Sequence, residues 1–110
     1  MDINQKFHFI KAAPKFNEDQ SYLGLENPDF QEELSKLIND QIDRFNDAAD
    51  AMYTEELYRD LIKSSLQKFD NYNLDYHDRR YISHQYQIIL KVIRLESADD
   101  ILNNWLYFNE

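Results

Sequence analysis

The sequence predicts a single all-α domain, an up-and-down bundle of four main helices with a short N-terminal helix. Apolar residues recur at spacings of three and four over most of the chain, which is the period of amphipathic helices. The 110 residues include one Gly and two Pro, too few for the turns of a sandwich or barrel. The hydrophobic fraction is 43%, enough for one core, and no linker or repeat divides the chain. We therefore expect one domain over residues 1–110.

The first helix is predicted over residues 3–12. Asp2 followed by Gln5 matches a capping box. Pro14 ends the helix because its ring disfavours the helical conformation at the preceding residue. The polar segment from Lys15 to Asn27 is typical of a loop. We expect its apolar end to pack on the core: Tyr22-Leu23-Gly24-Leu25.

Two helices are predicted next, over residues 28–51 and 55–70. Asn27 is a favoured N-cap and Pro28 suits the first helical position. Thr54 restarts a helix, but neither Gly nor Pro separates the two segments, so one kinked helix remains an alternative. The expected buried positions of both are Phe30, Leu34, Leu37, Ile38, Phe45, Ala49, Met52, Leu57, Tyr58, Leu61, Ile62, Leu66 and Phe69.

Asp75 is the predicted N-cap of a third long helix, over residues 76–95. Its wide apolar arc, which includes Tyr86 and Ile88, predicts the most central helix. A polar stripe lies opposite: Arg80, His84, Gln87, Lys91 and Arg94. Ser97 followed by Asp100 resembles another capping box and opens a last helix, whose apolar positions are Ile101, Leu102, Trp105, Leu106 and Phe108.

The net charge of −9 argues against nucleic acid and anionic membranes as partners, since both attract basic proteins. No apolar stretch is long enough to span a bilayer, and no basic segment followed by an apolar run marks a signal peptide. We therefore expect a cytoplasmic protein. The absence of Cys excludes thiolate chemistry.

Known catalytic patterns are missing from the sequence. With one Gly the chain has neither a nucleophile elbow nor a phosphate-binding loop. His77 and His84 are two helical turns apart, roughly 10 Å along the axis, which is too far for both to bind one ion. We expect no enzyme activity, metal or cofactor.

Four aspartates share one side of the first long helix: Asp40, Asp43, Asp47 and Asp50. Charged helix faces usually face water, and that is the simpler interpretation. The functional interpretation is a docking surface for a basic protein partner, as in an immunity or inhibitor protein, and this is our leading expectation. The mainly basic third long helix pairs with these acids within the bundle or between subunits, so the chain is a monomer or a homodimer.

A second candidate site is an aromatic pocket around Tyr76, Arg80, Tyr81 and Trp105. Arg79 and Arg80 are suited to gripping a carboxylate or phosphate. The simpler interpretation is that they lie over aromatic rings and pair with Asp75 or Asp78. Binding of a small molecule here is the alternative to the interaction module.

Several segments carry a family resemblance across residues 7–108. They are Tyr22-Leu23-Gly24-Leu25, Asp75-Tyr76-His77-Asp78-Arg79-Arg80-Tyr81-Ile82, Leu95-Glu96-Ser97 and Leu102-Asn103-Asn104-Trp105-Leu106-Tyr107-Phe108. In these segments the chain resembles a family of small, uncharacterised bacterial helical proteins, classed as a domain of unknown function. The resemblance implies a bacterial source and one helical domain. It supplies no activity, cofactor or site residue.

Overall fold

The computed structural model describes residues 2–20, 22–96 and 98–108. These residues form five α-helices, and no strand occurs among them. Short 3-10 turns precede the second helix (Pro28–Phe30) and follow the third (Lys68–Asn71). The helices are α1 (Ile3–Ala12), α2 (Gln31–Asp50), α3 (Glu55–Gln67), α4 (Tyr76–Val92) and α5 (Asp99–Phe108). The all-α prediction is confirmed.

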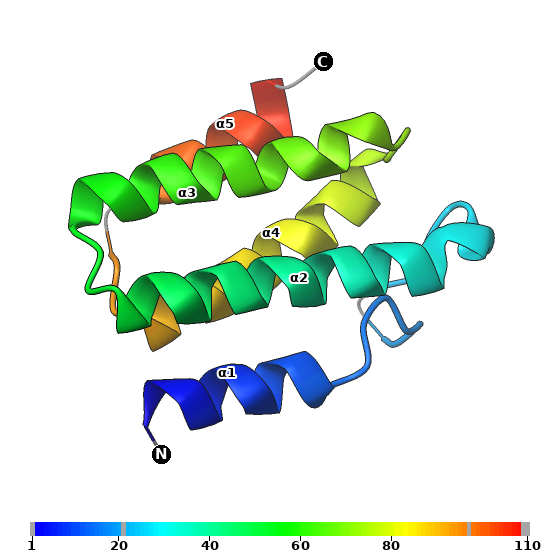
Figure 1. Ribbon diagram of the computed structural model, residues 1–110. Coiled ribbons are helices and arrows are strands. Elements are labelled where there is room, and N and C mark those ends of the chain that lie inside the picture. Colours follow the sequence, from blue (N-terminus) through cyan, green and yellow to red (C-terminus); the bar gives the residue numbers. More distant parts are fainter. Residues whose placement is uncertain (1, 21, 97, 109–110) are drawn as a thin grey trace.

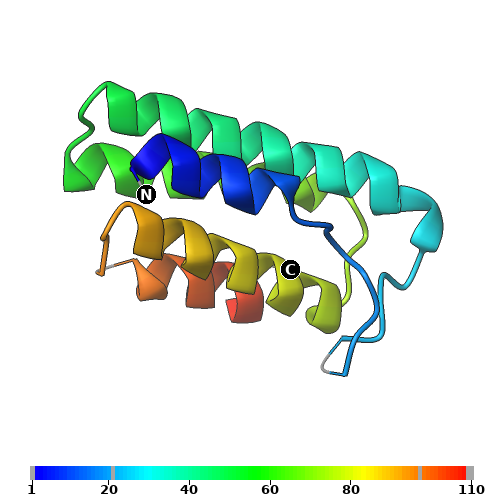
Figure 2. The ribbon, with the colours of Figure 1, turned by 90° about the horizontal axis from the view of Figure 1, so that it is seen from below.

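Successive helices run in alternating directions, so the bundle is up-and-down (Figure 1). Helix α2 lies between α3 and the short α1, and α4 and α5 form the other side of the molecule (Figures 1 and 2). Helix α1 contacts both α2 and α4, and α5 contacts both α3 and α4. The connection from α1 to α2 passes around the end of the bundle at which α2 and α4 begin (Figure 2).

The helix starts follow the sequence closely. The Asp2, Thr54 and Asp75 side chains accept hydrogen bonds from the backbone N–H groups three residues ahead of them, as N-caps do. Asp2 and Gln5 complete the predicted capping box. Ser97, the predicted cap of the last helix, lies outside the described residues, and so does the side chain of Phe108.

Helices α2 and α4 end without glycine. In α2 the N–H of Tyr53 donates to the carbonyl of Ala48, and that of Met52 donates to Ala49, which is the Schellman pattern. Met52 takes the left-handed conformation that this pattern requires, with φ of 57°. Arg94 does the same at the end of α4, also with φ of 57°. The chain from 28 to 70 therefore forms two helices, not one kinked helix.

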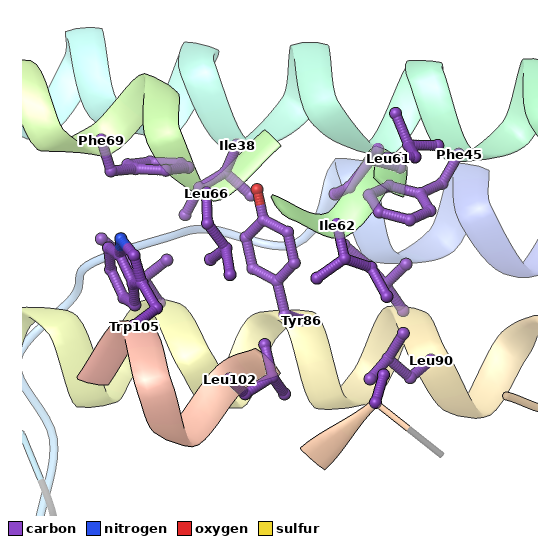
Figure 3. Packing of buried hydrophobic residues seen from close by; sticks show 14 of the residues in the cluster. Ile38, Phe45, Leu61, Ile62, Leu66, Phe69, Tyr86, Leu90, Leu102 and Trp105 are labelled. Carbon is purple, nitrogen blue, oxygen red and sulfur yellow. The ribbon is translucent and has the colours of Figure 1, made fainter. Parts of the chain in front are cut away.

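One hydrophobic core fills the space between the helices (Figure 3). Tyr86 of α4 points towards α2 and α3 and lies among Ile38, Ile62 and Leu66 (Figure 3). The Tyr86 hydroxyl is hydrogen-bonded to Ser65, whose own hydroxyl donates to Gln41 Oε1 at 2.9 Å. All three residues are buried, so the centre of the core holds a small polar network.

Several positions that we expected to be buried are exposed. Leu57, Ile88 and Met52 keep 47%, 42% and 86% of their surfaces accessible, and Leu23 of the loop is exposed as well. The three-to-four spacing identifies the apolar side of a helix, but it does not show how much of that side its neighbours cover. Met52 belongs to the left-handed turn that ends α2, where no helix packs on it.

Candidate ligand pocket

The loop between α1 and α2 is attached to α4 by aromatic packing. The ring of Tyr81 on α4 stacks on Tyr22 with centroids 4.6 Å apart, and it contacts Phe16 at 4.7 Å. The backbone N–H of Phe16 donates to the Tyr81 hydroxyl at 2.8 Å. Phe16 is buried with φ of 61°, so this anchor holds a strained backbone in place.

A buried carboxylate forms the second attachment. Asp78 on α4 accepts a hydrogen bond from the Tyr22 hydroxyl at 2.7 Å and a longer one from the Glu26 backbone N–H at 3.4 Å. Burial raises the pKa of Asp78, and the hydrogen bond from Tyr22 partly opposes that rise. Burial and the neighbouring Asp78 raise the pKa of Tyr22, so its hydroxyl keeps its proton. The loop is therefore held at both its aromatic and its polar contacts.

A pocket of about 550 Å³ lies between this loop and the first half of α4. The loop contributes residues 20 and 22–26, including Leu23 and Leu25. The helix side contributes Asp75, His77, Arg80, Tyr81 and His84. The volume lies within the range that holds small organic ligands. Because Tyr22 and Tyr81 are themselves fixed, the pocket is preformed.

The helix wall of the pocket carries a guanidinium, that of Arg80, with an imidazole on each side of it. His77, Arg80 and His84 follow one another at spacings of three and four, and so share a face of α4. Among the described residues, none of these three side chains makes an ion pair. The acids on the pocket are Glu26 and Asp75, and Asp75 already accepts from the backbone N–H of Asp78 at 2.8 Å.

Arg79, the sequence neighbour of Arg80, is engaged within the fold. Its guanidinium lies 4.5 Å from the centroid of the Trp105 ring and 3.5 Å from Asp70 Oδ1. The Trp105 indole N–H donates to the same Asp70 oxygen at 3.0 Å. The simpler interpretation, an arginine lying over an aromatic ring and paired with an acid, therefore describes Arg79. Its partner is Asp70, and not Asp75 or Asp78 as expected.

The four residues of the sequence-predicted pocket do not all lie together. Arg80 and Tyr81 line the pocket. Tyr76 instead packs on Tyr107, with ring centroids 5.9 Å apart, and Trp105 lies in a groove between α3 and α5. The residues that the sequence did not assign are His77, His84 and the loop wall. The sequence shows the spacing of the two histidines, but it does not show that the loop faces them.

The four aspartates of α2 lie in different surroundings. Asp43 pairs with Lys11 of α1, with Nζ 2.9 Å from Oδ2. Asp40, Asp47 and Asp50 are exposed, and their side chains make no ion pair with other described residues. Three of the four predicted docking residues therefore face solvent, while Asp43 helps to hold α1.

Two further features bear on function. No group of three or more His, Asp or Glu suited to holding a metal ion occurs within residues 2–20, 22–96 and 98–108. Over the same ranges, none of the helices combines the length and the apolar character that crossing a bilayer requires.

Comparison with known proteins places the chain in a family. A crystal structure of a DUF3571 family protein from Acinetobacter baumannii AYE matches with a TM-score of 0.84 and 25% identity. The match covers 96% of this chain and 88% of that one. No curated protein matches the sequence. The family model of a domain of unknown function, DUF4844, matches residues 1–110, and the chain therefore belongs to the DUF4844 family.

Proposed function

We propose that this chain is a small-molecule-binding module whose site is the pocket between the α1–α2 loop and α4. The observation that carries the proposal is a preformed cavity of about 550 Å³ in which apolar and ionisable side chains meet. Binding sites for small molecules combine a mainly apolar lining with a few polar groups that orient the ligand. Here Leu25 and Tyr22 supply apolar surface, and Arg80 supplies five N–H donors.

The internal support of the site favours binding over a purely structural role. Tyr81 and Asp78 are both occupied in holding the loop, whereas Arg80 on the same helix turn makes no ion pair among the described residues. The loop is therefore held on α4 by Tyr81 and Asp78, and Arg80 is not needed for this attachment. Such preorganisation lowers the ordering cost of binding.

The test is a titration with four single-ring probes: benzoate, phenyl phosphate, benzamide and benzylamine. Backbone amide chemical shifts of residues 22–26 and 75–84 should move for at least one probe. Leu25→Trp, which places a large ring in the pocket, should abolish these shifts, while Leu57→Trp on the exposed surface of α3 should not. No shift at these amides at about 10 mM of every probe, where even a millimolar site is filled, would reject the proposal.

We propose a second function for the acidic face of α2, which is the docking of a basic protein. Its support is the exposure of Asp40, Asp47 and Asp50 on one helix in a chain of net charge −9. Steering by such a face acts mainly on the association rate, so a cognate partner should bind more slowly as salt rises.

Charge reversal tests this second proposal. A basic partner recovered from source-cell extract should bind the native chain and lose most of its binding to the triple variant Asp40→Lys, Asp47→Lys, Asp50→Lys. The variant Arg80→Gln, on α4, should still bind it. A partner that binds the triple variant equally well would exclude the α2 face as the docking surface.

A further inference from the structure

The chemistry of the pocket wall also indicates the class of ligand, provided that the pocket is a binding site as proposed above. We propose that the ligand is a small organic anion, with a carboxylate or phosphate head held by Arg80 between His77 and His84 and an apolar body against the loop. Three features of the pocket support this ligand class: the guanidinium of Arg80, the two imidazoles beside it and the apolar wall of the loop.

Arg80 is placed for an oxyanion. A guanidinium donates two parallel hydrogen bonds to a carboxylate or phosphate, and these charge-assisted bonds are the strong ones in proteins. Arg79, the neighbouring arginine, has partners within the fold. It pairs with Asp70 and lies over the ring of Trp105. Arg80 lines the pocket instead, and no described carboxylate lies within ion-pair distance of it.

The two histidines flank Arg80 on the same face, one turn before it and one turn after it. Each imidazole adds a ring N–H donor beside the guanidinium. The acids of this region are Glu26 on the loop and Asp75 at the start of α4, with the buried Asp78 hydrogen-bonded to Tyr22 and Asp19 earlier in the loop. Arg80 is therefore the group that would hold an anion by charge, with the imidazoles beside it as hydrogen-bond donors.

The loop wall indicates that the anion carries an apolar body. Leu23 and Leu25 line the pocket on the loop side, and the stacked rings of Tyr22 and Tyr81 line it as well. Inorganic phosphate would leave these surfaces uncovered, whereas a ring or a short alkyl chain would remove them from water. We therefore expect phenyl phosphate and benzoate to bind more tightly than inorganic phosphate.

The first experiment compares probes that differ in their polar head group or lack an apolar ring, by amide chemical-shift titration of the native chain. Benzoate and phenyl phosphate should bind, benzamide and benzylamine should bind at least about tenfold more weakly, and inorganic phosphate alone should lie between. The stronger of the two anions distinguishes a carboxylate from a phosphate ligand. If benzamide binds as tightly as benzoate, the anion assignment is overturned while the pocket itself stands. If no probe shifts residues 22–26 and 75–84, both proposals fail.

Variants identify the groups that hold the anion. Arg80→Gln should weaken benzoate binding by about tenfold, whereas Lys91→Gln, the same charge change on α4 outside the pocket, should leave it unchanged. Glu26→Gln should strengthen binding several-fold, a gain that damage to the fold would not produce. Equal effects of Arg80→Gln and Lys91→Gln would show a non-specific charge effect and overturn the proposal.

The double variant His77→Ala, His84→Ala tests the two side chains that flank Arg80. It should weaken benzoate binding several-fold, because two ring N–H donors beside the guanidinium are lost. Circular dichroism of each variant confirms that the helices are retained. Benzoate binding equal to that of the native chain would contradict the role of the two histidines.

Discussion

The Tyr22 hydroxyl donates a 2.7 Å hydrogen bond to Asp78, which lies 56 residues further along the chain. This contact joins the loop between α1 and α2 to the fourth helix, and the candidate pocket lies beside it. A carboxylate that is buried at such a junction makes the stability of the fold depend on pH.

We predict that Asp78→Asn makes the free energy of unfolding depend less on pH in the acid range. Because burial raises the pKa of Asp78, the folded state holds more protons than the unfolded state between the ordinary aspartate pKa and the raised value. The free energy of unfolding contributed by this group therefore falls as the pH rises from about 4. Asparagine keeps an acceptor for Tyr22 and loses only the long contact with the Glu26 N–H.

Urea denaturation between about pH 4 and 7 measures this effect. The difference in unfolding free energy between Asp78→Asn and the native chain should shift in favour of the variant as the pH rises. Asp60→Asn, an exposed aspartate of α3, is the control and should give a constant difference. A constant difference for Asp78→Asn as well would contradict the prediction.

The companion variant Tyr22→Phe should destabilise the fold by about 1–3 kcal/mol at neutral pH, because it removes the donor from a buried carboxylate. The ring remains stacked on Tyr81, so packing is retained. Chemical denaturation gives the value, and a cost near zero would mean that water replaces the hydroxyl.

The end of α2 gives a prediction of increased stability. Met52 is 86% exposed and takes a left-handed conformation that suits glycine, so Met52→Gly should stabilise the chain by about 0.5–1 kcal/mol. Met52→Val should destabilise it, because a β-branched residue is disfavoured there. Thermal unfolding compares the two variants. A loss of stability with glycine would show that the Met52 side chain has contacts that matter.

The same ends show what the sequence could and could not predict. Helix starts were predictable because a cap acts over three residues, as at Thr54 and Asp75. The end of α2 at residue 50 agrees with the expected 51, but α4 ends at Val92, short of the expected 95. The turn after α4 has no signal in the sequence, because Arg94 has no intrinsic preference for the left-handed conformation and only the surrounding hydrogen bonds impose it. The pocket was half predicted: Arg80 and Tyr81 lie on one helix, but the opposite wall comes from a loop that meets them only after folding.

Two leucines one turn apart on α3 test the boundary of the core. Leu61 is 9% exposed and packs near Phe45, whereas Leu57 is 47% exposed (Figure 3). Leu61→Ala should cost about 2–5 kcal/mol of stability, and Leu57→Ala about 0.5 kcal/mol or less. Urea denaturation of both variants decides this. Similar costs would mean that the apolar stripe of α3 is buried along its whole length, as the sequence alone suggested.

The last prediction concerns the polar network in the core. Tyr86→Phe should lower the free energy of unfolding by about 1–2 kcal/mol, because Ser65 can still donate to Gln41. Gln41 also accepts a hydrogen bond from Arg44 at 2.9 Å. Ser65→Ala should cost more, since it leaves the Tyr86 hydroxyl buried without its partner.

The double variant Ser65→Ala, Tyr86→Phe should then be nearly as stable as Tyr86→Phe alone, because no orphaned hydroxyl remains between them. A double-mutant cycle by chemical denaturation measures this coupling. If the two single costs simply add, the hydroxyls do not act as a pair, and the buried position of Tyr86 is maintained by the packing of its ring against Phe45 and Phe69.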